Sequence, residues 1–165
     1  MCGVCGIYNF NQQEIDLGVL KTINAKLEKR GPDSGGVFND KYVGLGNRRL
    51  KIIDFEGGDQ PFYNENRDIV LVYNGEIYNY LEIKKKLLLK GIKFTTKSDT
   101  EVLLQSYKVF GIDFLKKIEG MWSFAIWDDD KKKLILSKDR FSEKPLYTFQ
   151  NSDGIYFGSE IKYLR

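Results

Sequence analysis

Apolar and polar positions alternate along several short stretches of the chain and recur at helical spacing along others. Residues 3–10 alternate in the manner of a half-buried strand. The leucine and isoleucine residues between 17 and 27 recur every three or four positions, as they do on one face of a helix. The pattern predicts a strand near the start of the chain, followed by an amphipathic helix over about 16–29.

Two further helices are marked by residues that commonly begin a helix. Asn79 precedes a helical stretch over 80–90 and is expected to cap it. The tetrapeptide Ser98-Asp99-Thr100-Glu101 has the form of a capping box and opens a helix that runs to about Phe110. A short helical piece is expected near 114–118.

The remaining apolar runs are short and bounded by turn residues, which is typical of strands. They lie at 36–38, 42–45, 50–53, 69–73, 121–127, 133–138, 146–150 and 155–158. Strands cluster towards both ends of the chain with helices between them, and the run Phe124-Ala125-Ile126-Trp127 is apolar throughout. This order predicts an α+β domain in which sheets pack between helical layers.

Length, composition and charge limit the class of protein. With 165 residues and 42% hydrophobic content, the chain is expected to form one globular domain with a substantial core. Its 26 basic and 23 acidic residues are spread evenly, so we expect no nucleic-acid partner. No run reaches the ~18 apolar residues of a membrane span, and no basic and apolar leader follows Met1. We therefore expect a cytoplasmic protein with no membrane partner.

Cys2 is the candidate nucleophile. Removal of the initiator methionine would leave a thiol and a free α-amine on one residue, and an amine of this kind can accept the thiol proton near neutral pH. The chain contains no histidine, which excludes Cys-His and Ser-His pairs and every histidine metal ligand. A cysteine at position 2 is uninformative by itself, so its interpretation depends on the rest of the sequence.

Cys2 and Cys5 have the C-x-x-C spacing that also occurs in redox and metal sites. A structural zinc site would need two further ligands, and the chain has neither another cysteine nor a histidine. Cys5 also lies within the alternating strand pattern, where a small buried side chain is common. The sequence therefore favours a structural role for Cys5 over a redox or metal pair.

Two polar segments allow both a structural and a functional interpretation. The glycines of segment 30–36 are explained by a helix end and a loop. Segment 47–54 places arginine in an extended run, where its planar fork could bind a substrate carboxylate, although surface strands commonly carry arginine without such a role. These alternatives remain open at this point.

Two other polar segments are equally ambiguous. Asn74-Gly75 interrupts an extended run, either as a hairpin turn or as an oxyanion hole made by the Asn74 side-chain amide and the Gly75 N–H. Asp99 begins a predicted helix, where its carboxylate either holds an ammonium group or simply favours the helix dipole.

Taken in order, these segments resemble the glutaminase domain of class II glutamine amidotransferases, in the asparagine synthetase branch. The matching pieces are MCG at 1–3, RGPD at 30–33, RRLKIID at 48–54, QPFYN at 60–64, YNGEIYN at 73–79, SDTEV at 98–102, GMWSFAIWD at 120–128, KDRFSEKPLY at 138–147 and GSEIKYL at 158–164. Each piece alone is a weak signal. Their order and spacing along nearly the whole chain make the resemblance specific.

The resemblance implies an N-terminal nucleophile hydrolase fold, a four-layer αββα sandwich that spans 1–165. It implies that Cys2 attacks the side-chain amide of L-glutamine and forms a thioester, and that glutamate and ammonia are released. The α-amine of Cys2 would act as the base. Asn74 and Gly75 would hold the oxyanion.

The same resemblance implies how the ends of the amino-acid substrate are held. Arg49 would bind the α-carboxylate, while Glu76 and Asp99 would receive the α-ammonium. Backbone groups near Ile52 and Ile53 would line the pocket. This layout suits zwitterionic glutamine, which needs one fixed cation and anions on the other side.

Three positions depart from the family pattern. Asn47 stands where many members have histidine, and Cys5 stands where a small or apolar residue is usual. Ser142 replaces a glycine of the family, and we expect strain there if the loop requires a positive φ. None of the three is among the residues expected to perform the chemistry.

The sequence lacks a Ser-Gly-Gly-x-Asp-Ser pyrophosphate loop, so an ATP-dependent synthetase half is expected to lie outside it. The resemblance implies a synthetase domain as partner, in cis or in trans, with ATP and Mg²⁺ needed only by that half and no cofactor in this domain. A homodimer remains open, as does the ammonia acceptor. The alternative function is a non-catalytic glutamine-binding or interaction domain, which would follow if Met1 were retained and the Cys2 nitrogen remained an amide.

Overall fold

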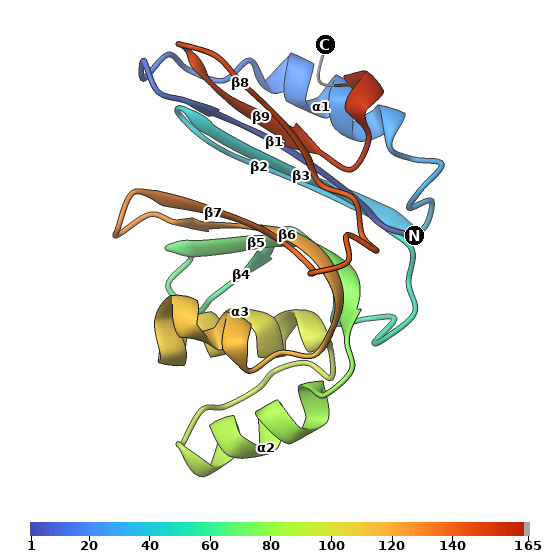
Figure 1. Ribbon diagram of the computed structural model, residues 1–165, viewed down its shortest axis with the longest axis vertical. Helices are drawn as coiled ribbons and strands as arrows, with labels where there is room; N and C mark the ends of the chain where they lie inside the picture. Colours follow the sequence, from blue (N-terminus) through green and yellow to red (C-terminus); the bar gives the residue numbers. More distant parts are fainter. Residues whose placement is uncertain (164–165) are drawn as a thin grey trace.

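The computed structural model describes residues 1–163, which form two antiparallel sheets flanked by helices (Figure 1). In chain order the elements are β1 (Gly3–Asn9), α1 (Leu17–Lys26), β2 (Ser34–Asp40), β3 (Val43–Arg49), β4 (Phe62–Tyr63), β5 (Ile69–Ile77), α2 (Tyr80–Leu89), α3 (Asp99–Phe110), the 3-10 helix η1 (Gly111–Lys116), β6 (Gly120–Asp128), β7 (Lys133–Lys138), β8 (Tyr147–Gln150), β9 (Gly154–Gly158) and the 3-10 helix η2 (Ile161–Tyr163).

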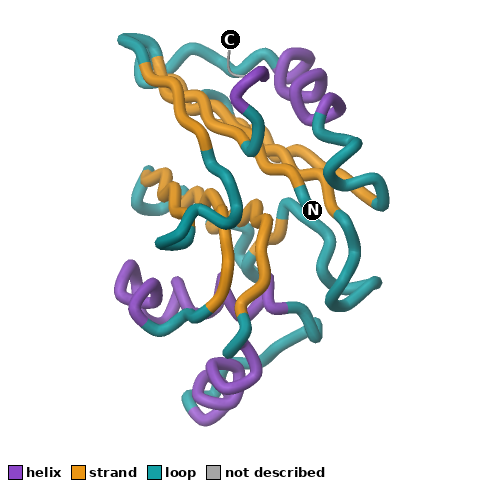
Figure 2. The backbone as a smooth tube through the Cα atoms, turned by 45° about the vertical axis from the view of Figure 1, so that its right-hand side comes forward, coloured by secondary structure: helices purple, strands orange, loops and turns teal. Residues whose placement is uncertain are grey.

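The elements stack in four layers. One sheet has the strand order β2-β3-β1-β9-β8 and the other has the order β4-β5-β6-β7. Helix α1 covers the outer face of the first sheet, while α3 covers the outer face of the second and α2 packs on α3 (Figures 1 and 2). This arrangement confirms the predicted αββα sandwich. No helix within residues 1–163 is both long enough and apolar enough to cross a membrane.

Three apolar layers hold the sandwich together. The layer between the sheets contains Trp127 and Phe157, both fully buried. The second layer lies between the four-stranded sheet and helices α2 and α3, and the third lies between α1 and the five-stranded sheet. Alternate residues of β1 enter different layers, because Val4 faces the other sheet whereas Cys5 faces α1. Alternation along this strand therefore directs the two nearby side chains to opposite faces.

The prediction of a strand over 50–53 is wrong. After β3 the chain enters a loop, because the Arg49 side chain turns back and its Nη2 donates to the carbonyl oxygens of Ile53 at 2.8 Å and Asp54 at 2.6 Å. Asp54 has a φ of 53°, outside the range of a strand. The carbonyl groups that a ladder would use are bound by arginine instead.

Two helix predictions also need correction. Helix α1 ends at Lys26 rather than 29, and tight turns continue from there to Arg30. Asn79 does not cap α2, because its side chain bonds to the backbone of Lys117 and Glu119 instead. Ser98 caps α3 as predicted, accepting from the Thr100 N–H at 3.1 Å.

The second half of the predicted capping box is not formed. Glu101 accepts hydrogen bonds from the backbone N–H groups of Thr95 and Thr96 rather than from the cap residue Ser98. Its buried carboxylate therefore fixes the loop that leads into α3. The positive φ expected at Ser142 is found, at 55°, so a serine occupies a conformation that favours glycine.

Candidate active site

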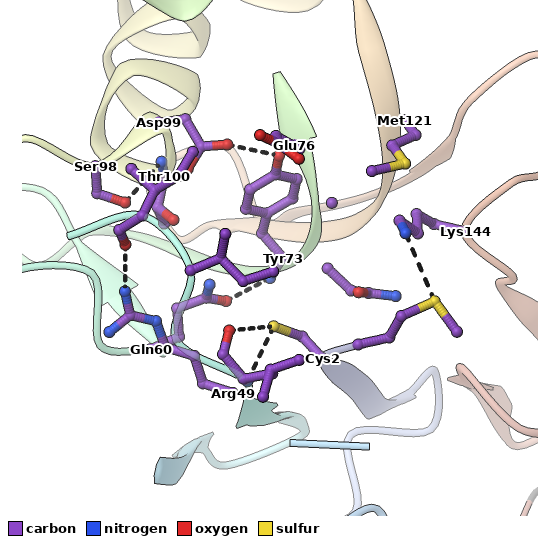
Figure 3. Close-up of a pocket in the computed structure, with 16 residues that line it drawn as sticks. Cys2, Arg49, Gln60, Tyr73, Glu76, Ser98, Asp99, Thr100, Met121 and Lys144 are labelled. Carbon is purple, nitrogen blue, oxygen red and sulfur yellow. Dashed lines mark hydrogen bonds between the residues drawn. The ribbon is translucent and has the colours of Figure 1, made fainter. Parts of the chain in front are cut away.

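A small cavity opens where β1 begins and β3 ends, and residues of β5 from the other sheet also line it (Figure 3). Its volume of about 130 Å³ is below the ~300–1,000 Å³ typical of drug-sized ligands, which suits a small substrate such as an amino acid. The structure brings all eight residues singled out from the sequence to its walls. They are Cys2, Arg49, Ile52, Ile53, Asn74, Gly75, Glu76 and Asp99.

Cys2 is half-buried, and both its thiol and its carbonyl group are held by hydrogen bonds. The Leu50 N–H donates to the Cys2 Sγ at 3.3 Å, and the Arg30 Nε donates to the Cys2 carbonyl oxygen at 3.0 Å. Arg30 is itself paired with Glu160 at 3.6 Å. The sequence interpretation assigned the segment around Arg30 to a loop and missed this contact with the candidate nucleophile.

Strand β5 runs unbroken through Asn74 and Gly75, so the structure excludes a hairpin turn at this dipeptide. Gly75 lies opposite Trp122 of β6. A Cβ at Gly75 would lie 2.2 Å from the Met121 carbonyl oxygen and 2.7 Å from the Tyr73 ring. The position therefore requires glycine because β6 and a neighbouring ring approach its backbone closely.

The Gly75 N–H points away from β6, as the bonds of its neighbours show. The Tyr73 N–H donates to the Gln60 Oε1 at 2.6 Å, and the Ile77 N–H donates to the Asp99 Oδ2 at 3.1 Å. Because alternate N–H groups of a strand point the same way, the Gly75 N–H lies between these two on the cavity side. Within the part of the chain that the structure describes, Gly75 N–H has no acceptor.

The Asn74 side chain is almost fully buried and has one weak partner. Its Nδ2 lies 3.5 Å from the Ser123 Oγ, at the outer limit of a hydrogen bond. A second N–H of this amide is therefore free to donate. Two donors, one from a side chain and one from the backbone, lie at adjacent positions of a rigid strand.

Arg49 is buried and its guanidinium is already bonded (Figure 3). Besides the carbonyl contacts described above, its Nη1 forms an ion pair with Asp59 at 3.0 Å. Gly58 makes room for this group, because a Cβ there would lie 2.2 Å from the Arg49 Nη2. Burial alone would raise the pKa of Asp59, but hydrogen bonds from Ser34 and Arg49 outweigh it, and the pKa is lowered.

Asp99 and Glu76 place two carboxylates on the opposite wall of the cavity (Figure 3). The Asp99 carboxylate accepts from the Tyr73 hydroxyl at 2.9 Å as well as from the Ile77 N–H. Burial raises the pKa of Asp99, hydrogen bonds from Ile77 and Tyr73 oppose this shift, and the Glu76 charge reinforces it. Burial also raises the pKa of Tyr73 well above its usual value, and the Asp99 charge adds to this effect.

Several residues that line the cavity were missed by the sequence interpretation. Gln60 orients β5 through the Tyr73 N–H, and Lys144 is only 9% exposed, with its Nζ 3.5 Å from the Met1 Sδ. Both residues lie inside pieces of the family resemblance, QPFYN and KDRFSEKPLY, and this was the one signal that could have found them. The other missed residues are Met1, Leu50, Tyr73, Ser98, Thr100 and Met121.

Cys5 is buried as predicted, with 1% of its surface exposed. Burial raises the pKa of its thiol to about 12, so the thiol stays protonated at neutral pH. Both cysteines are free, and residues 1–163 contain no cluster of three or more ligands suited to a metal ion. These observations argue against a C-x-x-C redox or metal pair.

Comparison with known proteins identifies the class to which this fold and site belong. The family described as glutamine amidotransferase domain matches residues 1–165. The chain belongs to this family. Its likeness to glutamine phosphoribosylpyrophosphate amidotransferase from B. subtilis, in a complex with ADP and GMP, has a TM-score of 0.80 at 23% identity and covers 98% of this chain and 42% of that one. The N-terminal nucleophile hydrolase fold implied by the sequence is thereby confirmed.

Two proteins of similar sequence refine the placement of this chain within the family. The chain is 42% identical to asparagine synthetase [glutamine-hydrolyzing] 1 of Bacillus subtilis (strain 168), over 99% of its own length and 26% of the relative. It is 39% identical to putative asparagine synthetase [glutamine-hydrolyzing] 2 of Methanocaldococcus jannaschii, over 98% of its own length and 34% of the relative. The chain therefore spans between a quarter and about a third of the length of these two relatives.

Proposed function

We propose that this domain hydrolyses the side-chain amide of L-glutamine to glutamate and ammonia, with the Cys2 thiol as nucleophile. The observation that carries the proposal is that a thiol, two adjacent N–H donors and fixed charges of both signs meet in one small cavity. Membership of the glutamine amidotransferase family supports the same reaction. The chemistry uses the thiol and the α-amine of Cys2 and requires no metal or cofactor in this domain.

The first half of the reaction forms a thioester. The α-amine of Cys2 takes the thiol proton, and the sulfur attacks the side-chain carbonyl carbon of glutamine. The oxygen becomes an oxyanion, which accepts hydrogen bonds from the Asn74 Nδ2 and the Gly75 N–H. Collapse of this intermediate breaks the C–N bond, and the nitrogen leaves as ammonia with the proton that the α-amine returns to it.

The second half releases glutamate. The neutral α-amine now takes a proton from water, and the resulting hydroxide attacks the thioester carbonyl carbon. The same two donors hold the second oxyanion. Breaking of the C–S bond returns the thiolate, which recovers the proton from the ammonium of Cys2. The thiol and the amine are thereby restored for the next cycle.

The charged wall of the cavity suits the other end of the substrate. The three hydrogen bonds of Arg49 described above use three of its five N–H groups, so two remain for the α-carboxylate of glutamine. Glu76 and Asp99 attract the α-ammonium. The backbone at Ile52 and Ile53 closes the side of the cavity between these groups.

We further propose that the ammonia is delivered to an amide-forming synthetase domain, in cis or in trans. The names of the relatives support this partner, because both are called glutamine-hydrolysing asparagine synthetases. ATP and Mg²⁺ would be needed by that partner alone. The acceptor of the ammonia is chosen by the partner rather than by the residues described above.

The decisive experiment compares two preparations of the chain with N-termini verified by intact mass. One begins at Cys2, and the other retains Met1, so that its Cys2 nitrogen is an amide. We expect the first to release glutamate and ammonia in equal amounts and the second to bind glutamine but hydrolyse it very slowly. Equal turnover of the two would show that the α-amine is not the base. A first preparation that binds glutamine without turnover would support the non-catalytic alternative.

A further inference from the structure

Lys144 is the one buried cation of the cavity that has no carboxylate partner among the described residues. Arg49, which also lines the cavity, forms an ion pair with Asp59, and nearby Arg30 pairs with Glu160. The Lys144 Nζ instead contacts the Met1 Sδ, and a thioether sulfur is a weak acceptor. A largely buried lysine without a carboxylate partner needs an explanation, because burying a charge without a partner is unfavourable.

Lys144 lines the same cavity as the nucleophile and contacts the residue that precedes it in the chain. Figure 3 shows Lys144 on the opposite side of the cavity from Arg49 and Ser98. Met1 is joined directly to the nitrogen of Cys2, so its removal takes away the only partner of the Lys144 Nζ among the described residues and also frees the α-amine of Cys2. The lysine then shares one cavity with two titratable groups, the thiol and the α-amine of Cys2.

We infer that Lys144 is a positioning residue whose positive charge favours the deprotonated form of the thiol–amine pair of Cys2. A nearby cation disfavours the ammonium form of the amine and favours the thiolate form of the thiol. Both effects lower the pH at which the pair loses its first proton, whichever of the two groups loses it. The inference rests on the proposed function, since it gives Lys144 a part in preparing that nucleophile.

Other charged groups face the same space and limit the size of the effect. The carboxylates of Glu76 and Asp99 act in the opposite direction to Lys144, while Arg30 and Arg49 are largely neutralised by their acidic partners. Three other titratable groups lie in this region, and each has partners of its own. The Tyr73 hydroxyl bonds to Asp99, and Lys51 pairs with Asp59. The Asp139 carboxylate accepts from the N–H groups of Trp122, Phe141, Glu143 and Lys144. Lys144 is thus the cation at this end of the cavity whose charge is least compensated.

The backbone around Lys144 is anchored by a buried carboxylate. The Lys144 N–H donates to the Asp139 Oδ2 at 3.0 Å, and the same carboxylate organises the turn from Phe141 to Glu143. The buried Asp139 also binds the Trp122 N–H of β6. The loop that carries Lys144 is therefore fastened to the strand that pairs with Asn74 and Gly75.

The test compares Lys144→Met and Lys144→Arg in the chain that begins at Cys2 and ends at Arg165. Lys144→Met keeps most of the side-chain length but removes the charge. We expect the acidic limb of kcat/KM for glutamine to move to higher pH by about half to one unit, the size of a charge pair near a protein surface. We expect Lys144→Arg to keep the wild-type profile. The control is Lys86→Met, on the exposed side of α2. It makes the same change in net charge but lies far from the cavity, so it should leave the profile unchanged.

A second measurement separates this inference from the proposed function. The rate of Cys2 alkylation by iodoacetamide, followed by intact mass, reports the thiolate without any turnover, and the buried Cys5 should not interfere. Its pH dependence should shift in Lys144→Met in the same direction as kcat/KM. Glutamine hydrolysis without any shift in either profile would overturn the role of Lys144 and leave the proposed function standing. A shift in the alkylation profile, with no glutamine hydrolysis by the wild type or any variant, would support the role of Lys144 and overturn the proposed function.

Two further outcomes would also overturn the inference. If Lys144→Arg shifted as far as Lys144→Met, the shape of the lysine rather than its charge would be responsible. If Lys144→Met melted below the assay temperature, Lys144→Gln would replace it as the neutral variant. An unchanged alkylation profile in Lys144→Gln would then overturn the inference.

Discussion

The two ends of the cavity are built in different ways. At the nucleophile end, the Cys2 Sγ is bonded only to the backbone of Leu50, and the Gly75 N–H has no acceptor among the described residues. At the charged end, Arg49 already binds three acceptors and Asp99 two donors. The nucleophile end therefore has donors ready for the substrate, whereas the charged end is held rigid by its own partners. Substitutions at the first end should change the rate, and those at the second should change affinity and stability together.

The largest effect is expected from Cys2→Ala. It removes the bond-forming atom, so glutamine hydrolysis should be abolished while glutamine binding, measured by calorimetry, and the melting temperature stay close to wild type. Cys2→Ser should retain little activity, because a hydroxyl is much less acidic than a thiol and the same amine activates it poorly. Full activity in Cys2→Ala would remove the distinction between the two ends.

Asn74→Ala should lower kcat by roughly 10²- to 10³-fold and change KM much less, because an oxyanion donor acts on charge that develops in the transition state. Ser123→Ala is the matched control, since it removes only the weak partner of the Asn74 amide. Steady-state kinetics of both variants provide the measurement. An Asn74→Ala variant altered only in KM would place Asn74 with the charged end.

Arg49→Ala should raise KM for glutamine by roughly 10- to 100-fold, the value of a hydrogen bond to a charged group. It should also destabilise the domain, because the carbonyl oxygens of Ile53 and Asp54 lose their buried donor. Arg49→Lys should recover little of either property, since an ammonium lacks the planar fork. Titration calorimetry and thermal melting measure the two effects. Unchanged affinity in Arg49→Ala would mean that another group binds the α-carboxylate.

A smaller effect is expected from pH at the charged end. Because burial raises the pKa of Asp99, its carboxylate becomes protonated at a higher pH than an ordinary aspartate as the solution is acidified. The attraction for the α-ammonium is then lost, so KM for glutamine should rise as the pH falls through that raised pKa. Asp99→Asn should have a higher KM at neutral pH and lack this dependence. A wild-type KM that is flat over the same range would contradict the assignment.

The smallest effect is expected from Cys5→Ala, which lies outside both ends. Loss of one buried sulfur against α1 should reduce the free energy of unfolding by about 1 kcal/mol, and kcat and KM should not change. Chemical denaturation and steady-state kinetics are the measurements. A folded but inactive Cys5→Ala would restore the redox or metal interpretation of the C-x-x-C spacing.

The layers of the fold could be predicted because apolar periodicity directly reflects which face of an element is buried. The errors lie where a side chain, rather than periodicity, determines the local structure. Residues 50–53 have a strand-like composition, yet Arg49 binds the carbonyl oxygens that follow them. Asn79 has the character of a cap, yet a distant segment at 117–119 binds its side chain. Contacts of this kind join residues far apart in sequence and leave no local pattern.

The candidate site was predictable to the extent that it depends on the identity of residues in short family motifs. All eight chosen residues reach the cavity, but their roles stay predictions until the variants are measured. Apart from its place in the QPFYN piece, nothing in the sequence indicates that Gln60 supports β5, because a glutamine before proline has no characteristic spacing. Nor could it reveal that Lys144 is buried, since burial of a lysine contradicts the usual preference of the residue.

The central position of β1 also affects how the chain is made. Among the described elements this strand is synthesised first, yet Cys5 pairs with Gly158 of β9, and the Val4 N–H donates to the Ser159 Oγ. At roughly 5–20 residues per second, the neighbours on this side are synthesised several seconds or more after the nucleophile itself. An enzyme that removes Met1 would therefore reach Cys2 long before the walls of its cavity exist, and the thiol gains the surroundings of the cavity only after β9 has been synthesised.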